Sequence, residues 1–211
     1  MTRVLKADAQ DALTEAVAVL KGGGLVAYPS DTVYGLGAAA SDERAVARVF
    51  AVKGRPSEKA LPLLLAEAED MAPLCAEVPA AAKLLVEHFW PGPLTLVLRR
   101  SPTFHSAALG GGEKVALRVP DHPLLRELIR ALGEPITGTS ANRSGRPSCR
   151  TAAEVEEELA DAVDLIIDGG PSRAGQESTV VDITEDTPRI MREGAISRRE
   201  IEKVLGQGVE V

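Results

Sequence analysis

Residues 115–140, VALRVPDHPLLRELIRALGEPITGTS, contain a complete strand–helix–strand unit. The apolar run at 115–119 is typical of a buried strand, and the run at 136–139 predicts a second one. Between them, leucine and isoleucine recur through 123–132 with the spacing of one helix face. Because a helix flanked by strands is the repeating unit of α/β proteins, this stretch predicts the α/β class.

The rest of the chain continues this alternation of strands and helices. Upstream, the predicted helices are 8–21, 42–52 and 80–89, and the predicted strands are 25–28, 61–65 and 94–98. Downstream, the predicted strands are 165–167, 179–183 and 190–191. Several strands follow one another without an intervening helix, which favours a mixed sheet over a purely parallel one.

Two further helix starts are marked by a capping box, in which a hydroxyl and a carboxylate three residues later each satisfy a free backbone donor. Thr151 and Glu154 form one such pair, and Ser197 and Glu200 form the other. Because the sequence has no repeats, linkers or low-complexity segments, we predict one domain over residues 1–211. Its expected architecture is a single twisted mixed sheet with helices packed on it.

The composition of the 211-residue chain is ordinary for a soluble globular protein, with 45% hydrophobic and 26% charged residues. It excludes disorder, collagen and coiled coil as descriptions of the whole chain. The apolar runs fall short of the roughly 20 residues that span a bilayer, and the N-terminus has no apolar signal core. Cys75 and Cys149 form no CxxC motif and are typical of reduced thiols. We therefore expect a cytoplasmic protein without membrane contact.

The net charge of −7 is unevenly distributed along the chain. Residues 151–172 carry acidic side chains and no lysine or arginine, whereas residues 136–150 carry arginines and no acidic residue. We interpret the acidic stretch as a solvated helix face. Aromatic residues make up only 3% of the chain, which argues against a platform for single-stranded nucleic acid.

Several common catalytic motifs are absent from the sequence. It contains no P-loop, no GxSxG nucleophile elbow and no HExxH, and its histidines lack zinc-site spacing, so we expect no protein-bound metal. Gly35-x-Gly37-x-x-Ala40 resembles a dinucleotide-binding fingerprint. Pro29 interrupts the preceding strand, however, and the expected ribose-binding carboxylate is missing. A Rossmann dehydrogenase is therefore disfavoured.

Residues 53–59, KGRPSEK, place three cations within seven residues. A polyphosphate needs such a cluster, because each cation offsets repulsion among phosphate oxygens and arginine can bind two of them at once. The same composition also fits a solvated surface turn, which composition alone slightly favours. In both interpretations we expect Lys53 and Arg55 to lie in a short polar loop outside the core.

Other polar segments lie at the ends of predicted strands, at 31–35, 140–145, 177–179 and 190–194. Open α/β sheets place ligands at strand ends, although such loops also serve as turns and helix caps. Each segment is a weak signal by itself, but together with residues 53–59 they predict one shared polar site. If the chain stays extended after residue 139, Ser140 and Asn142 project to the same side, toward one cavity.

Six segments, taken in order, resemble the successive motifs of the YrdC/TsaC family, whose members are threonylcarbamoyl-AMP synthases. The segments are YPSDTVYGLG (28–37), KGRPSEKAL (53–61), ALRVPDHP (116–123), TSANRSG (139–145), ESTVVD (177–182) and IMREG (190–194). The resemblance extends from about residue 10 to 205, and its K-x-R and S-x-N pairs are specific. Longer members carry a further C-terminal domain, and we expect this chain to be the short form without it.

This resemblance implies both a fold and a reaction. The implied fold is a twisted α/β sheet around a large, concave, positively charged cavity. The implied enzyme is a nucleotidyltransferase that converts L-threonine, bicarbonate and ATP, with Mg²⁺ carried by the nucleotide, into threonylcarbamoyl-AMP and pyrophosphate. Downstream tRNA threonylcarbamoyl-transferase proteins would then modify adenosine 37 of tRNA. Weak binding of tRNA by the chain itself is left open.

The family's functional positions carry over to this chain residue by residue. They assign catalysis to Lys53 and Arg55. The implied ATP contacts are Arg55, Lys59, Asn142, Arg150 and Arg192. The implied threonine contacts are Thr32, Arg118, Ser140 and Ser178, with Arg118 facing the carboxylate. The chain departs from the family pattern at Ser30, Ala60, Leu64 and Cys149-Arg150.

Two other functions fit parts of the sequence. A non-catalytic protein that binds double-stranded RNA or tRNA would also need a basic cavity, although the overall charge balance and the acidic helix argue against it. A relative that uses carbamoyl phosphate would be expected to carry zinc-binding cysteine clusters, which this chain lacks. The predicted function is therefore the synthase.

Overall fold

The computed structural model describes residues 2–159 and 161–211. Its α-helices are α1 (Ala12–Lys21), α2 (Glu43–Lys53), α3 (Ala80–Phe89), α4 (Pro123–Leu132), α5 (Ala152–Leu159) and α6 (Arg198–Leu205), with 3₁₀ helices η1 (Ala68–Leu74) and η2 (Ala107–Leu109). The predictions for 80–89 and 123–132 are confirmed residue for residue. Helix α1 begins later than the predicted residue 8.

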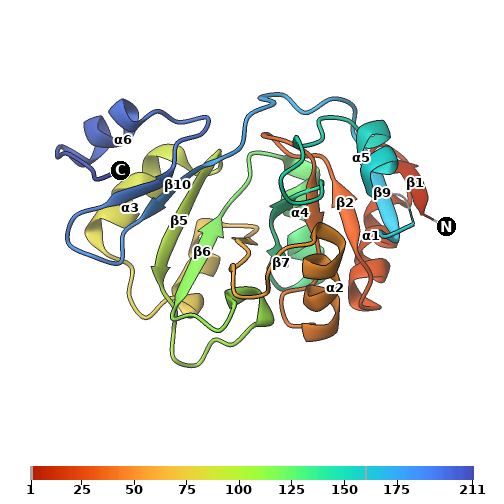
Figure 1. Ribbon diagram of the computed structural model, residues 1–211, viewed down its shortest axis with the longest axis horizontal. Helices are drawn as coiled ribbons and strands as arrows, with labels where there is room; N and C mark the ends of the chain where they lie inside the picture. Colours follow the sequence, from red (N-terminus) through yellow and green to blue (C-terminus); the bar gives the residue numbers. More distant parts are fainter. Residues whose placement is uncertain (1, 160) are drawn as a thin grey trace.

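The strands form two mixed sheets. The five-stranded sheet has the order β1 (Arg3–Lys6), β9 (Leu165–Asp168), β2 (Val26–Tyr28), β3 (Gly35–Gly37) and β8 (Thr139–Ser140). The six-stranded sheet has the order β11 (Arg189–Arg192), β10 (Thr179–Asp182), β5 (Leu94–Arg99), β6 (Lys114–Arg118), β4 (Leu63–Leu64) and β7 (Ile136–Thr137). Each sheet contains both parallel and antiparallel pairs. Figure 1 shows the sheets side by side, with α1 and α5 at one end of the molecule and α3 and α6 at the other.

The chain passes from one sheet to the other at Gly138. The sequence predicts a single strand over 136–139, but Gly138 separates β7 from β8. A Cβ atom at Gly138 would lie 2.6 Å from the side chain of Leu64, so a larger residue does not fit this crossing. The α/β class, the mixed strand directions and the packed helices are thus confirmed, while the expected single sheet is divided into two.

The sequence does not predict β1 or β3. Strand β3 is Gly35-Leu36-Gly37, and it pairs with β2 in antiparallel register. A Cβ atom at Gly35 would lie 2.2 Å from the ring of Tyr28, and one at Gly37 would lie 2.7 Å from it. The glycines therefore allow a buried tyrosine ring to lie across the strand, and the apparent dinucleotide fingerprint is a feature of sheet packing.

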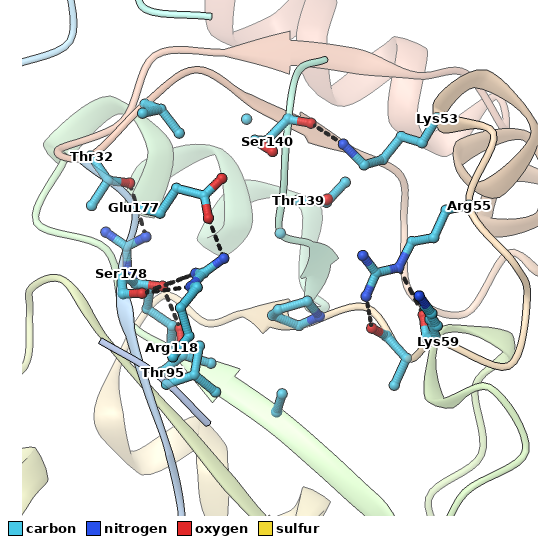
Figure 2. A pocket seen from close by; sticks show the side chains of 18 of the residues that line it. Thr32, Lys53, Arg55, Lys59, Thr95, Arg118, Thr139, Ser140, Glu177 and Ser178 are labelled. Atoms are coloured by element: carbon cyan, nitrogen blue, oxygen red, sulfur yellow. Dashed lines mark hydrogen bonds and ion pairs between the residues drawn. The ribbon is translucent and has the colours of Figure 1, made fainter. Parts of the chain in front are cut away.

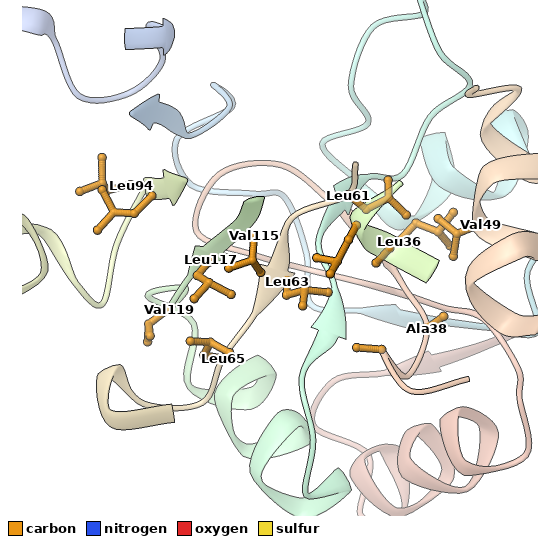
Figure 3. Packing of buried hydrophobic residues seen from close by; sticks show 14 of the residues in the cluster. Leu36, Ala38, Val49, Leu61, Leu63, Leu65, Leu94, Val115, Leu117 and Val119 are labelled. Carbon is orange, nitrogen blue, oxygen red and sulfur yellow. The ribbon is translucent and has the colours of Figure 1, made fainter. Parts of the chain in front are cut away.

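One hydrophobic cluster extends beneath both sheets (Figure 3). It includes Leu36 of β3 and Val49 of α2, together with Leu63, Leu94 and Leu117 of the six-stranded sheet. Burying a leucine or valine side chain is worth about 1.5–3 kcal/mol, so the shared cluster resists separation of the two sheets. The shared core therefore holds the two sheets in a fixed arrangement.

The predicted helix starts are confirmed. The N–H of Glu154 donates to Thr151 Oγ1 over 3.2 Å, and the N–H of Thr151 donates to the Glu154 carboxylate over 3.3 Å. Ser197 and Glu200 exchange the same two bonds at the start of α6. Among residues 2–159 and 161–211, no helix combines the length and the apolar character needed to cross a bilayer.

Candidate active site

A cavity of about 780 Å³ is lined by residues from both sheets and from the loops between them. This volume falls in the usual range for small-molecule sites. The predicted site residues that line it are Thr32, Lys53, Arg55, Lys59, Arg118, Ser140, Asn142, Ser178 and Arg192. Figure 2 shows their arrangement, with Thr32, Arg118 and Ser178 on one side and Lys53, Arg55 and Lys59 on the other.

Arg118, the last residue of β6, is held by three hydrogen bonds. Its Nε donates to the Gly92 carbonyl over 2.9 Å, Nη1 to Thr32 Oγ1 over 3.1 Å, and Nη2 to Asp31 Oδ1 over 2.6 Å. The side chains of Arg118 and Asp31 are only 8% and 10% exposed. Burial lowers the pKa of Arg118, and the charge of Asp31 opposes this effect. The remaining guanidinium N–H groups can receive a carboxylate in a fixed orientation.

A second polar cluster joins three strands of the six-stranded sheet. Ser178 Oγ, just before β10, lies 2.9 Å from Thr95 Oγ1 on β5. Arg192 on β11 donates to the Ser178 carbonyl over 2.9 Å and to Ser178 Oγ over 3.2 Å, and it forms an ion pair with Glu177. Sequence reasoning missed Thr95, because it lies inside the apolar run at 94–98 and only strand alternation marks it.

Lys53 does not lie in a polar loop. It is the last residue of α2, and it is only 3% exposed. Its Nζ donates to the Ser140 carbonyl over 2.5 Å and to the Asn142 carbonyl over 2.8 Å. Burial, with a further contribution from the charge of Arg55, lowers the pKa of Lys53 to about 8. The expectation that Lys53 lies outside the core is therefore wrong.

Lys53, Arg55 and Lys59 form a cationic wall on one side of the cavity, and Arg55 and Lys59 are the part of it that lies in a loop. The Nε of Arg55 donates to the Lys59 carbonyl and Nη2 donates to the Ala60 carbonyl, both over 2.9 Å. These bonds close the loop on itself. Burial and the charge of Arg192 lower the pKa of Arg55, so two guanidinium groups act on each other here. Such a pair favours an anion between them.

Ser140 and Asn142 both line the cavity, as the extended geometry predicts. Asn142 is 5% exposed, and its Nδ2 donates to the carbonyls of Arg143 and Arg146 over 3.0 and 2.7 Å. Its Oδ1 is buried without a hydrogen-bond partner. The Nδ2 group of Asn142 thus stabilises the loop that follows it, while Oδ1 is available to accept a hydrogen bond from a ligand.

The cavity concentrates positive charge although the chain carries a net charge of −7. In the part of the chain that the structure describes, the basic lining residues are Lys53, Arg55, Lys59, Lys114, Arg118, Arg146 and Arg192. The acidic lining residues are Glu177 and Asp182. Clefts lined by one sign of charge raise the local concentration of oppositely charged ligands. The arrangement is therefore suited to a polyanion.

Residues 18–194 match the model of a protein family that carries the names Sua5, YciO and YrdC and the description "Telomere recombination". The chain belongs to the Sua5/YciO/YrdC family. Its fold agrees with this membership, because a solved structure described as Pyrococcus abyssi Sua5 complexed with L-threonine superposes on it with a TM-score of 0.93. That comparison has 41% sequence identity and covers 100% of this chain and 62% of the other.

Curated relatives carry the name threonylcarbamoyl-AMP synthase. The protein from Pyrococcus abyssi is 45% identical over 192 residues, which cover 91% of this chain and 56% of the relative. The protein from Bacillus subtilis is 43% identical over 195 residues, which cover 92% of this chain and 56% of the relative. The chain thus spans about half the length of these two relatives.

The departures from the Sua5/YciO/YrdC motif pattern have different structural consequences. Ser30 keeps a hydroxyl, which donates to the Val33 carbonyl over 2.6 Å and lies 3.0 Å from Thr32 Oγ1. Ala60 and Leu64 instead add apolar side chains to the lining of the cavity. Ser30 thus keeps a hydroxyl beside Thr32, whereas Ala60 and Leu64 make the cavity lining more apolar than the family pattern does.

Among the predicted site residues, Arg150 alone does not line the cavity. Its N–H donates to Glu154 over 2.5 Å, and its guanidinium group lies against the backbone of Gly175. A contact between Arg150 and ATP stays a prediction that requires this side chain to move.

Proposed function

We propose that this protein is a threonylcarbamoyl-AMP synthase, which forms threonylcarbamoyl-AMP and pyrophosphate from L-threonine, bicarbonate and ATP. The observation that carries the proposal is one cavity with two kinds of cationic wall. Arg118 is buried and held in one orientation, which suits a single carboxylate. Arg55 and Lys59 on one side of the cavity and Arg192 on the other supply the positive charge that a triphosphate requires.

The chemistry of this reaction depends mainly on positioning. The amine of threonine and bicarbonate form a carbamate, and a carbamate oxygen attacks the α-phosphorus of ATP. The bond from the α-phosphorus to the bridging oxygen breaks, and pyrophosphate leaves. Such a step needs aligned reactants and neutralised phosphate charge more than a protein nucleophile. Cations on two facing walls supply this environment.

The names of the relatives support an enzyme over the alternative of a non-catalytic RNA-binding protein. The Pyrococcus abyssi protein of the solved structure is described as bound to L-threonine, which supports the amino-acid half of the proposal. We propose that Mg²⁺ enters as part of the substrate MgATP. We also propose that the product passes to transferase proteins that modify adenosine 37 of tRNA.

The release of pyrophosphate from ATP tests the proposed function. We expect release to require L-threonine and bicarbonate together, and to fall to background when either is omitted. Omission of bicarbonate requires degassed buffer, because dissolved carbon dioxide replaces it. Equal ATP turnover without threonine would show that the assignment is wrong. A salt-sensitive shift with plain duplex RNA, without any turnover, would favour the RNA-binding alternative.

A further inference from the structure

Glu177 lies at the junction of the two predicted ligand sites. It directly precedes Ser178, a predicted threonine contact, and it forms an ion pair with Arg192, a predicted ATP contact. Its other carboxylate oxygen accepts a hydrogen bond from Ser148 Oγ over 2.8 Å. The side chain is 34% exposed and lines the cavity. Figure 2 shows it on the side of the cavity that also carries Thr32.

The proposed reaction requires a proton acceptor. At neutral pH free threonine carries an ammonium group, which has no lone pair for attack on carbon. Loss of one proton gives the amine, whose nitrogen forms a bond to the carbon of bicarbonate while one C–O bond of bicarbonate breaks and water leaves. The products are one carbamate, one water molecule and one proton. A group in the cavity therefore has to take that proton.

Few groups that line the cavity can do so, and Lys53 is not one of them, because its Nζ donates to the carbonyls of Ser140 and Asn142. Among the described residues, the titratable lining side chains that are not lysine, arginine or tyrosine are Glu177 and Asp182. Asp182 is held by Lys114 over 2.7 Å and by the hydroxyl of Thr184 over 2.7 Å, and it also borders a second groove. It lies at the end of β10 away from Ser178. Glu177 is the carboxylate placed next to both predicted ligands.

We propose that Glu177 is the general base of this reaction, and that its carboxylate takes the proton from the ammonium group of bound threonine. The inference rests on the proposed function. After the carbamate has formed, the protonated side chain returns the proton to water, which its partial exposure allows. Glu177 would thus touch the substrate and act as a catalytic residue.

The binding of ATP prepares this base. In the ligand-free protein, Arg192 and Ser148 each occupy one carboxylate oxygen of Glu177. A triphosphate is a stronger competitor for an arginine fork than one carboxylate, and its charge repels the carboxylate. Arg192 therefore exchanges Glu177 for phosphate. The charged groups that face the released carboxylate are Arg192 on β11 and Lys53 at the end of α2.

The test uses the full chain with Glu177→Gln, which keeps the side-chain length and an acceptor oxygen but cannot take a proton. At pH 7 we expect pyrophosphate release to fall at least about 100-fold. The rate of the variant should recover by about tenfold per pH unit toward pH 9.5, because threonine then loses its proton without help. Binding of MgATP and of L-threonine, measured by calorimetry, should stay within about threefold of the wild type.

The matched control is Glu210→Gln, which removes the exposed ion pair between Glu210 and Arg189. Arg189 lies on β11, the strand that also carries Arg192. It should release pyrophosphate at the wild-type rate. Glu177→Asp keeps a base and should retain more activity than Glu177→Gln. A Glu177→Gln variant with wild-type turnover at pH 7, or with a defect that does not change with pH, overturns the proposal. A wild type without threonine-dependent turnover would instead overturn the proposed function itself.

Discussion

The two walls of the cavity are built in different ways. Arg118 and Thr95 stand on adjacent strands of the six-stranded sheet, buried and fixed by short hydrogen bonds. Arg55 and Lys59 lie in a loop, and the donors of Arg55 are used on the carbonyls of that loop. The first wall is ready for a ligand of one shape, whereas the second can adjust to the charge that arrives. The site thus combines preorganised side chains on strands with side chains in a loop that can adapt to the ligand.

Lys53 shares features of both walls. It is fixed at the end of α2, it adds positive charge to the cationic wall, and it donates hydrogen bonds to the loop at 140–142. A cation that is buried and bonded in this way supports the structure as well as the ligand.

Arg118→Ala should have the largest effect, because it breaks a buried ion pair. The charge of Asp31 would be left uncompensated, which typically costs about 3–5 kcal/mol of unfolding free energy. Affinity for L-threonine should fall at least about 100-fold, since charge-assisted hydrogen bonds are worth about 1.5–3 kcal/mol each. Urea denaturation and calorimetry measure the two effects.

Arg189→Ala is the matched control for Arg118→Ala. The pair of Arg189 with Glu210 is exposed on both sides, at 57% and 53%, and such pairs contribute about 0–1 kcal/mol. We expect stability close to that of the wild type and unchanged threonine affinity. If Arg118→Ala were no more destabilising than Arg189→Ala, the strand-built wall would not be preorganised as described.

The next contrast is between Lys53→Ala and Arg55→Ala. Each should lower pyrophosphate release at least about tenfold, because each removes a cation from the proposed triphosphate site. Only Lys53→Ala should also lower the urea midpoint, since it leaves two carbonyls in the interior without their donor, at roughly 1–3 kcal/mol each. Arg55→Ala removes bonds within one loop and should unfold near the wild-type midpoint.

Arg55→Lys sharpens this contrast. A lysine keeps the positive charge but cannot copy the arginine fork, so turnover should stay low if Arg55 binds two phosphate oxygens. Equal urea midpoints for Lys53→Ala and Arg55→Ala would show that Lys53 at the end of α2 contributes no more to stability than Arg55 in the loop. Normal turnover in Arg55→Lys would show that charge alone is needed there.

Much of the fold follows from local patterns in the sequence. The helices at 80–89 and 123–132 are predicted to the residue, the first with Pro91-Gly92-Pro93 to end it and the second from leucine and isoleucine periodicity, and apolar runs predict most strands. The missed strand β1 is mostly exposed at a sheet edge and therefore has no apolar run to mark it. The division into two sheets depends on the contact between Gly138 and Leu64, which are remote in sequence.

Local sequence patterns predict the site less completely than they predict the fold. The family motifs predict which residues meet in the cavity, but the role of a side chain depends on its depth. Lys53 stands in the polar run KGRPSEK, where composition favours a solvated turn. Its burial results from the place where α2 ends relative to the loop at 140–142. Arg150 differs from Lys53, because its motif position predicts a contact with ATP, whereas its side chain does not line the ligand-free cavity and lies beside Gly175.

The lowered pKa of Lys53 predicts a pH dependence of stability. With a pKa of about 8 in the folded protein and 10.5 as the ordinary value, the folded state loses this proton while the unfolded chain keeps it. Stability from this group therefore rises with pH between about 8 and 10.5. Against Lys53→Met, which cannot titrate, the wild type should gain about 1–3 kcal/mol over this window in urea denaturation. A difference that stays constant or falls with pH would contradict the buried position of the ammonium group.

The smallest expected effects separate the two ligands within one loop. Ser140 and Asn142 line the same cavity, and the family resemblance places Ser140 beside threonine and Asn142 beside the nucleotide. Loss of one neutral hydrogen bond is worth about 0.5–1.5 kcal/mol, so Ser140→Ala should weaken threonine binding several-fold and leave ATP affinity nearly unchanged. Asn142→Ala should do the reverse, and somewhat more strongly, because its Nδ2 also holds the carbonyls of Arg143 and Arg146. Calorimetry with each ligand alone decides between these outcomes. If both variants lose affinity for the same ligand equally, Ser140 and Asn142 do not contact separate ligands. The two residues would then act as one unit, because Lys53 binds the backbone carbonyls of both.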